Sequence, residues 1–289
     1  MNGILNLYKP AGPTSFDCVA AVRRVAEGAK TGHGGTLDPM AEGVLAICIG
    51  KATRLIEYMD EDSKSYICGC RLGLRTDTLD IWGEVLGEDR EGAERISRSD
   101  FESAMEKFRG EILQIPPMYS AVSVGGKRLY KYAREGKSVE VPPRNVSVFN
   151  IKLLEWNDEL KEAVFELECS RGTYIRSICG DIGEFLGCGA CMSSLLRTRT
   201  CGLQIENSVT LEEVKDMSAQ QLESILLPME TALGHMKRLE LCEDRAKRFV
   251  NGLPSWSVGL ESEGLRAVFS DSRLLGTARD GKIEKVLAP

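Results

Sequence analysis

Apolar residues recur at regular spacing along much of the chain and predict its main elements. A helix is predicted over 14–28, because three valines follow a Thr-Ser pair at helical spacing and a glycine ends the segment. The apolar run at 44–50 has the length of a buried strand. Every second residue is apolar over 66–72 and again over 163–170, which predicts two strands with one buried face each.

Between the first helix and the first of these strands lies a glycine-rich segment, TGHGGTLDPMAEG at 31–43, which we expect to be an irregular loop rather than a helix or strand. Pro39 restricts Asp38 to extended conformations, and the glycines permit a tight turn. Such a loop can display the Asp38 carboxylate as a nucleophile or base, or Asp38 can simply shape the turn. His33 is either a polar partner in the same pocket or an ordinary loop residue.

The strand at 163–170 leads through a polar triplet into a second predicted helix. Arg176 lies beside the expected buried face near the helix N-terminus, where a guanidinium can pair with a carboxylate from elsewhere in the fold; the alternative is a surface arginine. Tyr66 and Tyr174 are compatible with a pocket or with a core whose phenol groups reach the surface. The expected buried face of this helix comprises Ile175, Ile178, Ile182 and Phe185.

The remaining segments suggest a surface region and a second, smaller domain. The charged segment 84–107 predicts a solvated face that ends in a helix around Phe101 to Phe108, and 211–230 is acidic and helix-like. After it comes a short helical sequence, EDRAKRFV, and then short strands separated by Asp-Ser and Asp-Gly turns. We therefore expect one domain over 1–234 and a small β domain over 235–289, which is too short for a large core of its own and would dock on the first.

The composition is that of an ordinary folded protein, with 43% hydrophobic and 28% charged residues and a net charge of −6. This charge is uneven. Residues 206–230 carry six acidic side chains and one lysine, whereas 120–145 carry six basic side chains and two glutamates with tyrosines interleaved. Basic groups neutralise phosphates and aromatic rings stack on bases, so an RNA-facing arm at about 114–145 is one interpretation and a charged surface hairpin is the other.

Several classes of protein do not fit the sequence. We expect a cytoplasmic protein, because no apolar stretch approaches the length of a membrane span and the start, MNGILNLYKP, has no basic leader followed by an apolar region. The nucleotide-binding patterns GxxxxGK[ST] and GxGxxG are missing, as is the GxSxG nucleophile elbow. The ten cysteines are scattered; Cys188 and Cys191 form one CxxC pair, which suggests either a metal or redox site or two buried thiols.

Five long motifs, in order, resemble the TruB family of pseudouridine synthases, which isomerise a uridine in the T-loop of tRNA, at position 55. The resemblance covers almost the whole chain and is greater to the stand-alone bacterial enzymes than to relatives that use guide RNA. Its motifs are GILNLYKPAGPTSFDCV at 3–19, GHGGTLDPMAEGVLAICIGKATR at 32–54, KSYICGCRLGLRTDTLDIWG at 64–83, QIPPMYSAVSVGGKRLYKYAREG at 114–136 and CSRGTYIRSICGDIGEFLGCGA at 169–190.

The resemblance implies an α+β fold with a mixed, mainly antiparallel sheet flanked by helices. It also implies a small C-terminal PUA-type RNA-binding β-barrel and an arm that closes over the T-arm of tRNA. The implied partner is tRNA, with no membrane and no obligatory protein partner.

The resemblance also assigns roles to individual residues. Asp38 matches the catalytic aspartate, Arg176 the arginine that pairs with it, and Tyr66 the tyrosine that packs against the target base and is proposed to assist proton removal. For substrate binding it implies His33, Tyr174 and Leu195, together with the arm residues Lys127, Arg128 and Lys131. The sequence departs from the family pattern at Ser123, where a lysine is usual, and at Leu196, where an arginine is common. Both departures remove a positive charge and bear on RNA affinity rather than on chemistry.

The implied reaction needs no cofactor and no metal, because it breaks the C1′–N1 bond, rotates the uracil and forms a C1′–C5 bond. One carboxylate can add to C1′ or to C6, or can take a proton from C2′, and the sequence leaves these routes open. The target nucleotide must be flipped out of the T-loop to be reached. Two other interpretations remain: an RNA-binding or RNA-folding module, and a metal or redox protein that uses Cys188 and Cys191.

Overall fold

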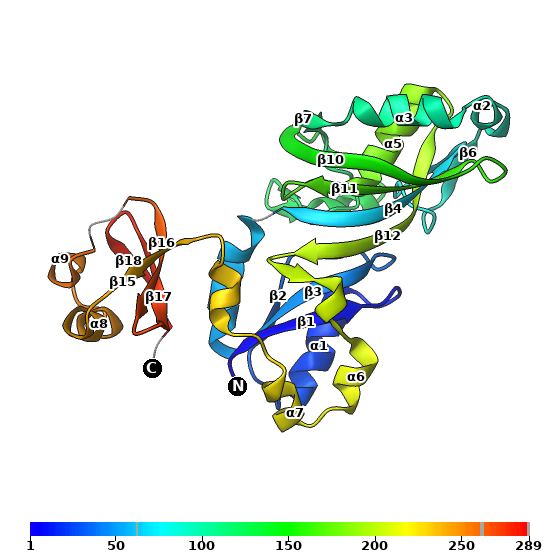
Figure 1. The fold of residues 1–289 in the computed structure, drawn as a ribbon. Helices are drawn as coiled ribbons and strands as arrows, with labels where there is room; N and C mark the ends of the chain where they lie inside the picture. Colours follow the sequence, from blue (N-terminus) through cyan, green and yellow to red (C-terminus); the bar gives the residue numbers. More distant parts are fainter. Residues whose placement is uncertain (62, 261–262, 288–289) are drawn as a thin grey trace.

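A ten-stranded sheet runs through the larger part of the molecule in a computed structural model that describes residues 1–61, 63–260 and 263–287 (Figure 1). The strand order is β14-β1-β3-β12-β4-β11-β10-β7, with β2 paired to β3 and β13 to β12. The bounds are β1 (Gly3–Lys9), β2 (Thr31–Gly34), β3 (Glu42–Ile49), β4 (Lys64–Leu72), β7 (Gly110–Gln114), β10 (Arg144–Asn157), β11 (Glu162–Cys169), β12 (Ala190–Thr200), β13 (Leu203–Gln204) and β14 (Val209–Thr210).

Most neighbouring strands of this sheet are antiparallel, and the pairs β1–β14 and β3–β12 are parallel. The β3–β12 junction is short, with Gly43 opposite Arg197, and it joins the two halves of the sheet. A side chain at Gly43 would collide with the Arg197 carbonyl oxygen, and the Gly43 φ of 103° also favours glycine. The predicted fold class, a mixed and mainly antiparallel sheet flanked by helices, is confirmed.

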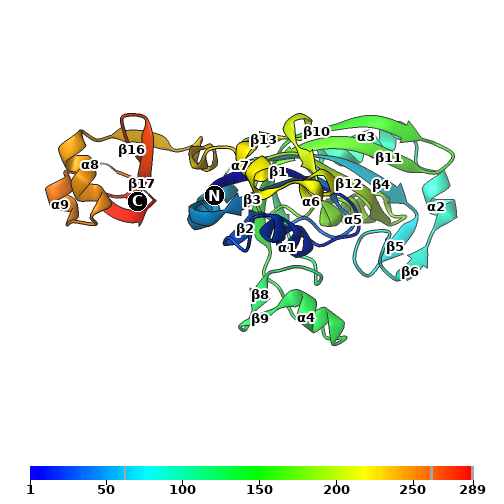
Figure 2. The ribbon, with the colours of Figure 1, turned by 90° about the horizontal axis from the view of Figure 1, so that it is seen from below.

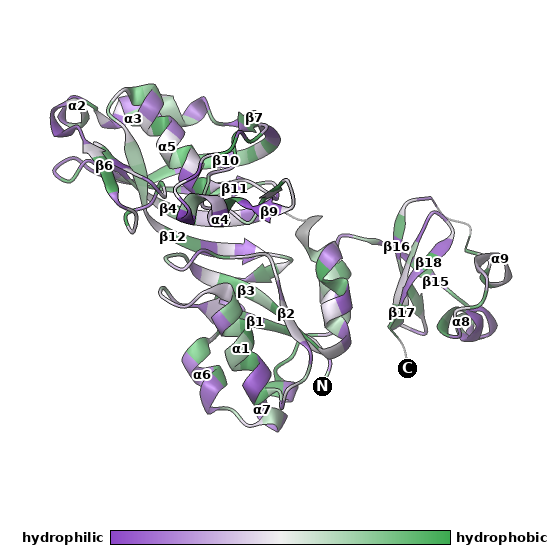
Figure 3. Cartoon of the chain, turned by 180° about the vertical axis from the view of Figure 1, so that it is seen from behind, coloured by the Kyte–Doolittle hydropathy of each residue, from purple (hydrophilic) through white to green (hydrophobic). Residues whose placement is uncertain are grey.

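Helices cover the two halves of the sheet separately. Next to β1 and β3 lie α1 (Ser15–Val25), α6 (Leu211–Asp216) and α7 (Ala219–Ser224), which share one apolar core. Against β4, β10 and β11 pack α3 (Arg98–Glu106) and α5 (Ile175–Leu186). In Figure 3 the interior strand β3 is mainly hydrophobic, as expected for a strand covered on its faces.

The elements predicted from apolar spacing are largely confirmed. The first helix begins at Ser15, where Thr14 and Asp17 form a capping box, and the strands at 44–50, 66–72 and 163–170 correspond to β3, β4 and β11. The predicted helix around Phe101 begins three residues earlier, at Arg98, because Ser97 and Asp100 form a second capping box.

Three expectations need correction. Residues 31–34 form strand β2, not loop, because their backbone pairs with β3, where His33 lies opposite Ile47. The acidic segment 211–230 is not one helix: α6 and α7 are separated at Met217, and the 3-10 turn η3 (Met229–Leu233) follows. Phe185, which we expected on the buried face of the second helix, is 58% exposed. Leu186 packs against the core at the end of α5 in its place.

A separate four-stranded sheet follows residue 236, as expected for a small C-terminal β unit (Figure 1). Its elements are β15 (Lys237–Glu240), α8 (Glu243–Val250), α9 (Ser255–Val258), β16 (Leu265–Ser270), β17 (Arg273–Arg279) and β18 (Lys282–Val286). It contacts the 3-10 segment η1 (Gly50–Glu61), where the Tyr58 hydroxyl donates to Glu284 at 2.8 Å and Lys285 pairs with Glu57 at 2.8 Å. The boundary at 234/235 stays a prediction.

The segment after β7 leaves the body of the molecule, and Figure 2 shows it projecting away from the sheet. It holds β8 (Ser123–Val124), β9 (Lys127–Arg128) and α4 (Leu129–Arg134), and we call residues 114–145 the arm. The other short elements are β5 (Leu74–Thr76), β6 (Val85–Glu88), α2 (Arg90–Glu94) and η2 (Ile205–Asn207). Among the helices of the described ranges, none has the length and apolarity needed to cross a membrane.

Candidate active site

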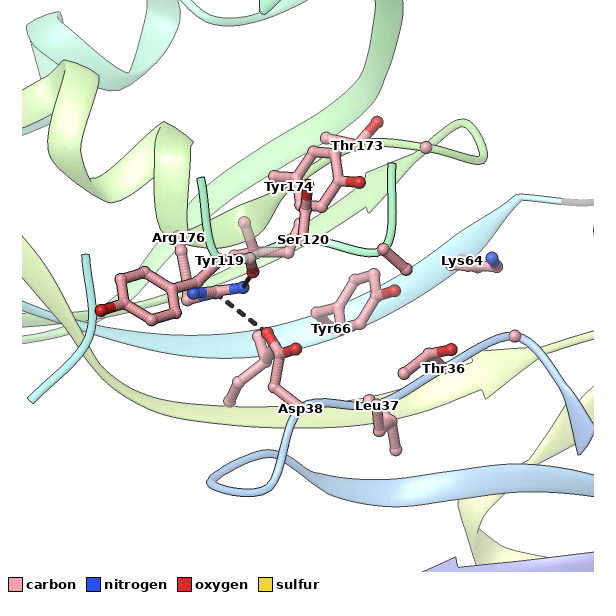
Figure 4. A pocket seen from close by; sticks show the side chains of 15 residues that line it. Thr36, Leu37, Asp38, Lys64, Tyr66, Tyr119, Ser120, Thr173, Tyr174 and Arg176 are labelled. Carbon is pink, nitrogen blue, oxygen red and sulfur yellow. Dashed lines mark hydrogen bonds and ion pairs between the residues drawn. The ribbon is translucent and has the colours of Figure 1, made fainter. Parts of the chain in front are cut away.

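A pocket of about 240 Å³ opens where the loop after β2, strand β4, the root of the arm and the N-terminus of α5 meet (Figure 4). Most of the residues that the sequence singled out for the target base lie here. Its lining is Gly35, Thr36, Leu37, Asp38, Lys64, Tyr66, Tyr119, Ser120, Ala121, Gly172, Thr173, Tyr174, Ile175, Arg176 and Leu195.

Asp38 and Arg176 form an ion pair in this pocket, with Asp38 Oδ2 2.9 Å from Arg176 Nε. The Arg176 side chain is 6% exposed, whereas that of Asp38 is 39% exposed. The pair therefore combines a buried cation with a carboxylate that a ligand in the pocket can reach. The surface alternative for Arg176 is wrong, because its guanidinium is enclosed.

The rest of the Arg176 guanidinium is also engaged. Its Nη1 donates to the Thr78 carbonyl and its Nη2 to the Tyr119 carbonyl, both at 2.8 Å. Nη1 also lies 3.6 Å from Oδ2 of Asp80, a carboxylate that is itself 9% exposed. With its donors directed to fixed acceptors, Arg176 holds one orientation toward Asp38.

The sequence analysis did not identify Asp80 as a candidate site residue, although Asp80 lies in the family motif at 64–83. Burial raises the pKa of Asp80, and the hydrogen bond from the Thr78 hydroxyl and the Arg176 charge act in the opposite direction. The Trp82 backbone N–H donates to the same carboxylate at 3.0 Å. Nothing in the sequence pattern distinguishes Asp80 from a turn-forming aspartate, since its role depends on an arginine almost a hundred residues away.

Two buried cations hold the backbone of the loop that carries Asp38. Lys9 donates to the carbonyls of Pro39 at 3.1 Å and Ala41 at 2.6 Å, which both belong to the turn that follows Asp38. Burial lowers the pKa of Lys9. Arg197 donates through Nε to the Val44 carbonyl at 2.8 Å, and its other nitrogens bond the carbonyls of Gly35 and Thr36. These carbonyls satisfy the buried cations and leave the loop few alternative conformations.

Tyr66, Tyr174 and Leu195 all line the pocket, as the resemblance implies. Tyr66 and Leu195 are buried, on β4 and β12 respectively. Tyr174 precedes the first turn of α5, and its backbone exchanges two hydrogen bonds with the Gln114 side chain, at 2.7 Å and 2.9 Å. Gln114 therefore ties the start of the arm to the helix that carries Arg176.

His33 lies on β2 and is not among the residues that line this pocket. Burial lowers its pKa, and the nearby Arg197 charge lowers it further. The structure thus places His33 beside the pocket loop rather than within its wall.

The three basic arm residues lie outside the pocket. Lys127 forms an ion pair with Glu135 and lies 4.5 Å from the centre of the Tyr132 ring. Arg128 donates to the Ala121 carbonyl at 3.1 Å, and Lys131 is exposed on α4. The arm thus presents basic and aromatic groups together.

The two departures from the family pattern lie in different surroundings. Ser123 is exposed on β8 of the arm, where a lysine side chain would extend into solvent. Leu196 lies within β12, opposite Glu42 of β3 and Ile67 of β4, and is half-buried.

The thiols of Cys188 and Cys191 are both buried and unbonded to each other. Burial raises the pKa of Cys191 to about 12, which disfavours the reactive thiolate. Within the ranges that the structure describes, no cluster of three His, Cys, Asp or Glu side chains has an arrangement that could hold a metal ion.

Comparison with known families gives one consistent result. The family described as TruB family pseudouridylate synthase (N terminal domain) matches residues 23–175. The family described as tRNA pseudouridylate synthase B C-terminal domain matches residues 176–234. Together these matches include the pocket lining from Gly35 to Leu195.

Individual relatives agree with the family matches. A Clostridium tetani protein named tRNA pseudouridine synthase B is 44% identical over 253 residues, which are 88% of this chain and 85% of the relative. A Heliobacterium modesticaldum protein of the same name is 46% identical over 260 residues, 90% of this chain and 83% of the relative. Among solved structures, a chain of a Cbf5-Nop10-Gar1 complex superposes with a TM-score of 0.77 at 26% identity, covering 99% of this chain and 85% of that one.

Proposed function

The chain belongs to the TruB family of pseudouridylate synthases, and from this membership we propose that it isomerises uridine to pseudouridine in the T-loop of tRNA, at position 55. The observation that carries the proposal is the Asp38–Arg176 ion pair, in which a reachable carboxylate is held by a buried arginine inside a pocket. Asp38, Tyr66 and Arg176 are the proposed catalytic group.

The reaction breaks the C1′–N1 bond, turns the uracil within the pocket and joins C1′ to C5, and the hydrogen on C5 leaves as a proton. Asp38 is the group that starts this sequence, by adding to C1′ or C6 or by removing a proton from C2′. Arg176 orients the carboxylate and balances its charge, since its remaining donors are bound to fixed carbonyls. The buried Tyr66 ring offers a stacking surface for the uracil.

Access to the pocket requires the target nucleotide to leave the T-loop stack, at a cost of a few kcal/mol that contacts in the pocket must recover. Tyr66, Tyr174 and Leu195 supply apolar contact for the base. His33, on the strand just before the Asp38 loop, is also proposed to take part in binding or flipping the target nucleotide.

Outside the pocket, the arm supplies electrostatic attraction for the T-arm phosphates through Lys127, Arg128 and Lys131. In this proposal residues 1–234 form the catalytic domain and residues 235–289 a PUA-like domain that adds a second RNA contact. The partner is tRNA alone, without an obligatory protein, and tRNA as substrate places the reaction in the cytoplasm.

The test is release of tritium from C5 of uridine in an unmodified tRNA transcript, with a transcript carrying cytidine at the T-loop position as control. Release that disappears in the control is the expected result. Asp38→Asn should abolish release while tRNA binding stays near that of the wild type. Tight binding by the wild type without any release would favour an RNA-binding or RNA-folding module, and loss of binding in Asp38→Asn would make Asp38 a structural residue.

A further inference from the structure

The root of the arm carries a buried hydroxyl that lacks a hydrogen-bond partner. Ser120 is 6% exposed and lines the pocket, and its Oγ meets neither a donor nor an acceptor among the residues that the structure describes. Buried polar groups are nearly always paired. An unpaired hydroxyl in the wall of a pocket therefore indicates a hydrogen bond that a ligand completes.

Hydrogen bonds hold Tyr119, the residue before Ser120, at its backbone carbonyl and at its side-chain hydroxyl. The Tyr119 carbonyl accepts a hydrogen bond from Nη2 of Arg176 at 2.8 Å, and the Tyr119 hydroxyl donates to Oδ2 of Asp77 at 2.9 Å. That hydrogen bond, together with burial, raises the pKa of Tyr119. Because Tyr119 is anchored to Arg176, the position of Ser120 is set relative to the same side chain that holds Asp38.

Backbone hydrogen bonds on the other side link Ser120 to the arm. The Ser120 carbonyl accepts from the backbone N–H of Tyr130 at 3.2 Å, and the Val122 carbonyl accepts from that of Leu129 at 2.8 Å. Both donors belong to the first turn of α4. Ser120 therefore lies between the arm helix and the Arg176 network, so a displacement of the arm changes the position of its hydroxyl.

Within the pocket, Ser120 lies across from Asp38. Figure 4 shows Ser120 and Tyr174 on one side of Tyr66 and Asp38 on the other. In the proposed function Asp38 acts at C1′, C2′ or C6, all near the glycosidic bond. A base stacked on Tyr66 with that end toward Asp38 turns its opposite edge, which carries N3–H and O4, toward Ser120.

We propose that Ser120 Oγ hydrogen-bonds the N3–H/O4 edge of the flipped uracil, a contact that rests on the proposed function. A hydroxyl can accept from N3–H or donate to O4, so one side chain suits either atom of this edge. The contact makes Ser120 a substrate-binding residue and couples recognition of the base to the position of the arm.

The first test compares Ser120→Ala with Ser177→Ala. Ser177 is a matched control, since it is 5% exposed, also has an unpaired Oγ among the described residues, and does not line the pocket. Ser120→Ala should lower kcat/KM on tRNA about tenfold, the value of one hydrogen bond, with an unchanged melting temperature. Ser177→Ala should keep the wild-type kcat/KM. Equal kcat/KM in Ser120→Ala and the wild type would overturn the proposal.

The second test identifies the atom that Ser120 contacts. Four tRNAs are prepared by ligation, with uridine, 4-thiouridine, 3-deazauridine or 2′-deoxyuridine at the target position, each carrying deuterium at C5. Loss of this deuterium is followed by mass spectrometry. The proposal expects the penalty of Ser120→Ala to vanish with 4-thiouridine, which weakens the O4 acceptor, or with 3-deazauridine, which lacks N3–H. A full penalty with both analogues would overturn it, as would a penalty that vanishes only with 2′-deoxyuridine.

Wild-type activity on tRNA that carries C5-deuterated uridine separates the proposed function from the proposed Ser120 contact. Absence of deuterium loss in the wild type contradicts the proposed function itself. Deuterium loss in the wild type, with no effect of Ser120→Ala, contradicts only the Ser120 contact.

Discussion

Oδ2 of Asp80 lies 3.6 Å from Nη1 of Arg176, so the guanidinium that binds Asp38 carries a second carboxylate on its other side. Asp80 touches Arg176 rather than the open part of the pocket, since it is not among the lining residues. It is therefore a positioning residue, which acts on Asp38 through the orientation of the arginine.

Asp80→Asn tests this positioning role. The asparagine keeps an oxygen for Thr78 and Trp82 but removes the charge that faces Arg176. We expect the single-turnover rate to fall about ten- to hundredfold, equivalent to roughly 1.4 to 2.7 kcal/mol of transition-state stabilisation, while the Kd for tRNA stays within about twofold. Asp181→Asn, on the same helix as Arg176 but outside the pocket lining, is the control. A parallel loss of tRNA binding would show that Asp80 supports the whole pocket instead.

The pH dependence of Asp80 should have opposite signs for activity and stability. Burial raises the pKa of Asp80 above its ordinary 3.8, so on acidification Asp80 takes up a proton at a higher pH than an exposed aspartate does. Arg176 then loses the negative charge of this partner. The rate should then fall on the acid side, and Asp80→Asn should lack this component. For stability, a raised pKa means that the folded state binds the proton more tightly, so this group lowers the free energy of unfolding as pH rises through the raised pKa. Rate profiles and urea unfolding at matched pH values measure the two effects, and equal signs would contradict the assignment.

The sequence predicted that Asp38 and Arg176 could pair, but it did not predict the residues that hold this ion pair in place. Asp38 and Arg176 stand in motifs long enough to carry a family resemblance. Asp80, by contrast, looks like any aspartate in a turn, and its importance arises only when β4, β5 and α5 pack together. The same holds for Ser120, because a lack of hydrogen-bond partners is a property of the folded chain and has no sequence pattern.

Buried cations show a second limit of sequence reasoning. Lys9 and Arg197 occupy strands, where a charged residue predicts a solvated face, yet both are enclosed. Carbonyls of the Asp38 loop provide the acceptors that make this possible, and those carbonyls are distant in sequence from Arg197. The wrong prediction of a loop at 31–34 has a similar origin. Pairing with β3 overrides the low strand preference of the two glycines in this segment.

Arg197→Met should destabilise the protein strongly, because it leaves the carbonyls of Gly35, Thr36 and Val44 without their donor. We expect the free energy of unfolding to fall by about 3 kcal/mol, measured by urea denaturation with linear extrapolation. Arg199→Met on the same strand removes an arginine that is 30% exposed and paired with Glu168, and should cost no more than about 1 kcal/mol. Similar losses in the two variants would show that the loop does not depend on Arg197.

The arm makes a prediction about salt. Replacing Lys127, Arg128 and Lys131 together with alanine should weaken tRNA binding and reduce the slope of log Kd against log salt concentration by about 2 to 3, since each phosphate contact contributes a little under one. The matched control removes the same charge from exposed arginines near α2 and α3, by the triple replacement of Arg90, Arg95 and Arg98 with alanine. An unchanged slope in the arm variant, or an equal reduction in the control, would mean that the arm does not carry the phosphate contacts.

His33 should make stability fall in mild acid. Burial and the Arg197 charge lower the pKa of His33 below its ordinary 6.5, so the folded state keeps the imidazole neutral where the unfolded chain protonates it. The stabilisation is therefore complete above pH 6.5 and is lost as pH falls below that value toward the lowered pKa. Melting temperatures between about pH 7 and pH 5 should fall less steeply in His33→Gln than in the wild type, because glutamine takes up no proton in this range. If His33→Gln instead keeps the full pH dependence but weakens tRNA binding, the imidazole contacts RNA and its place beside the Asp38 loop serves the substrate rather than the fold.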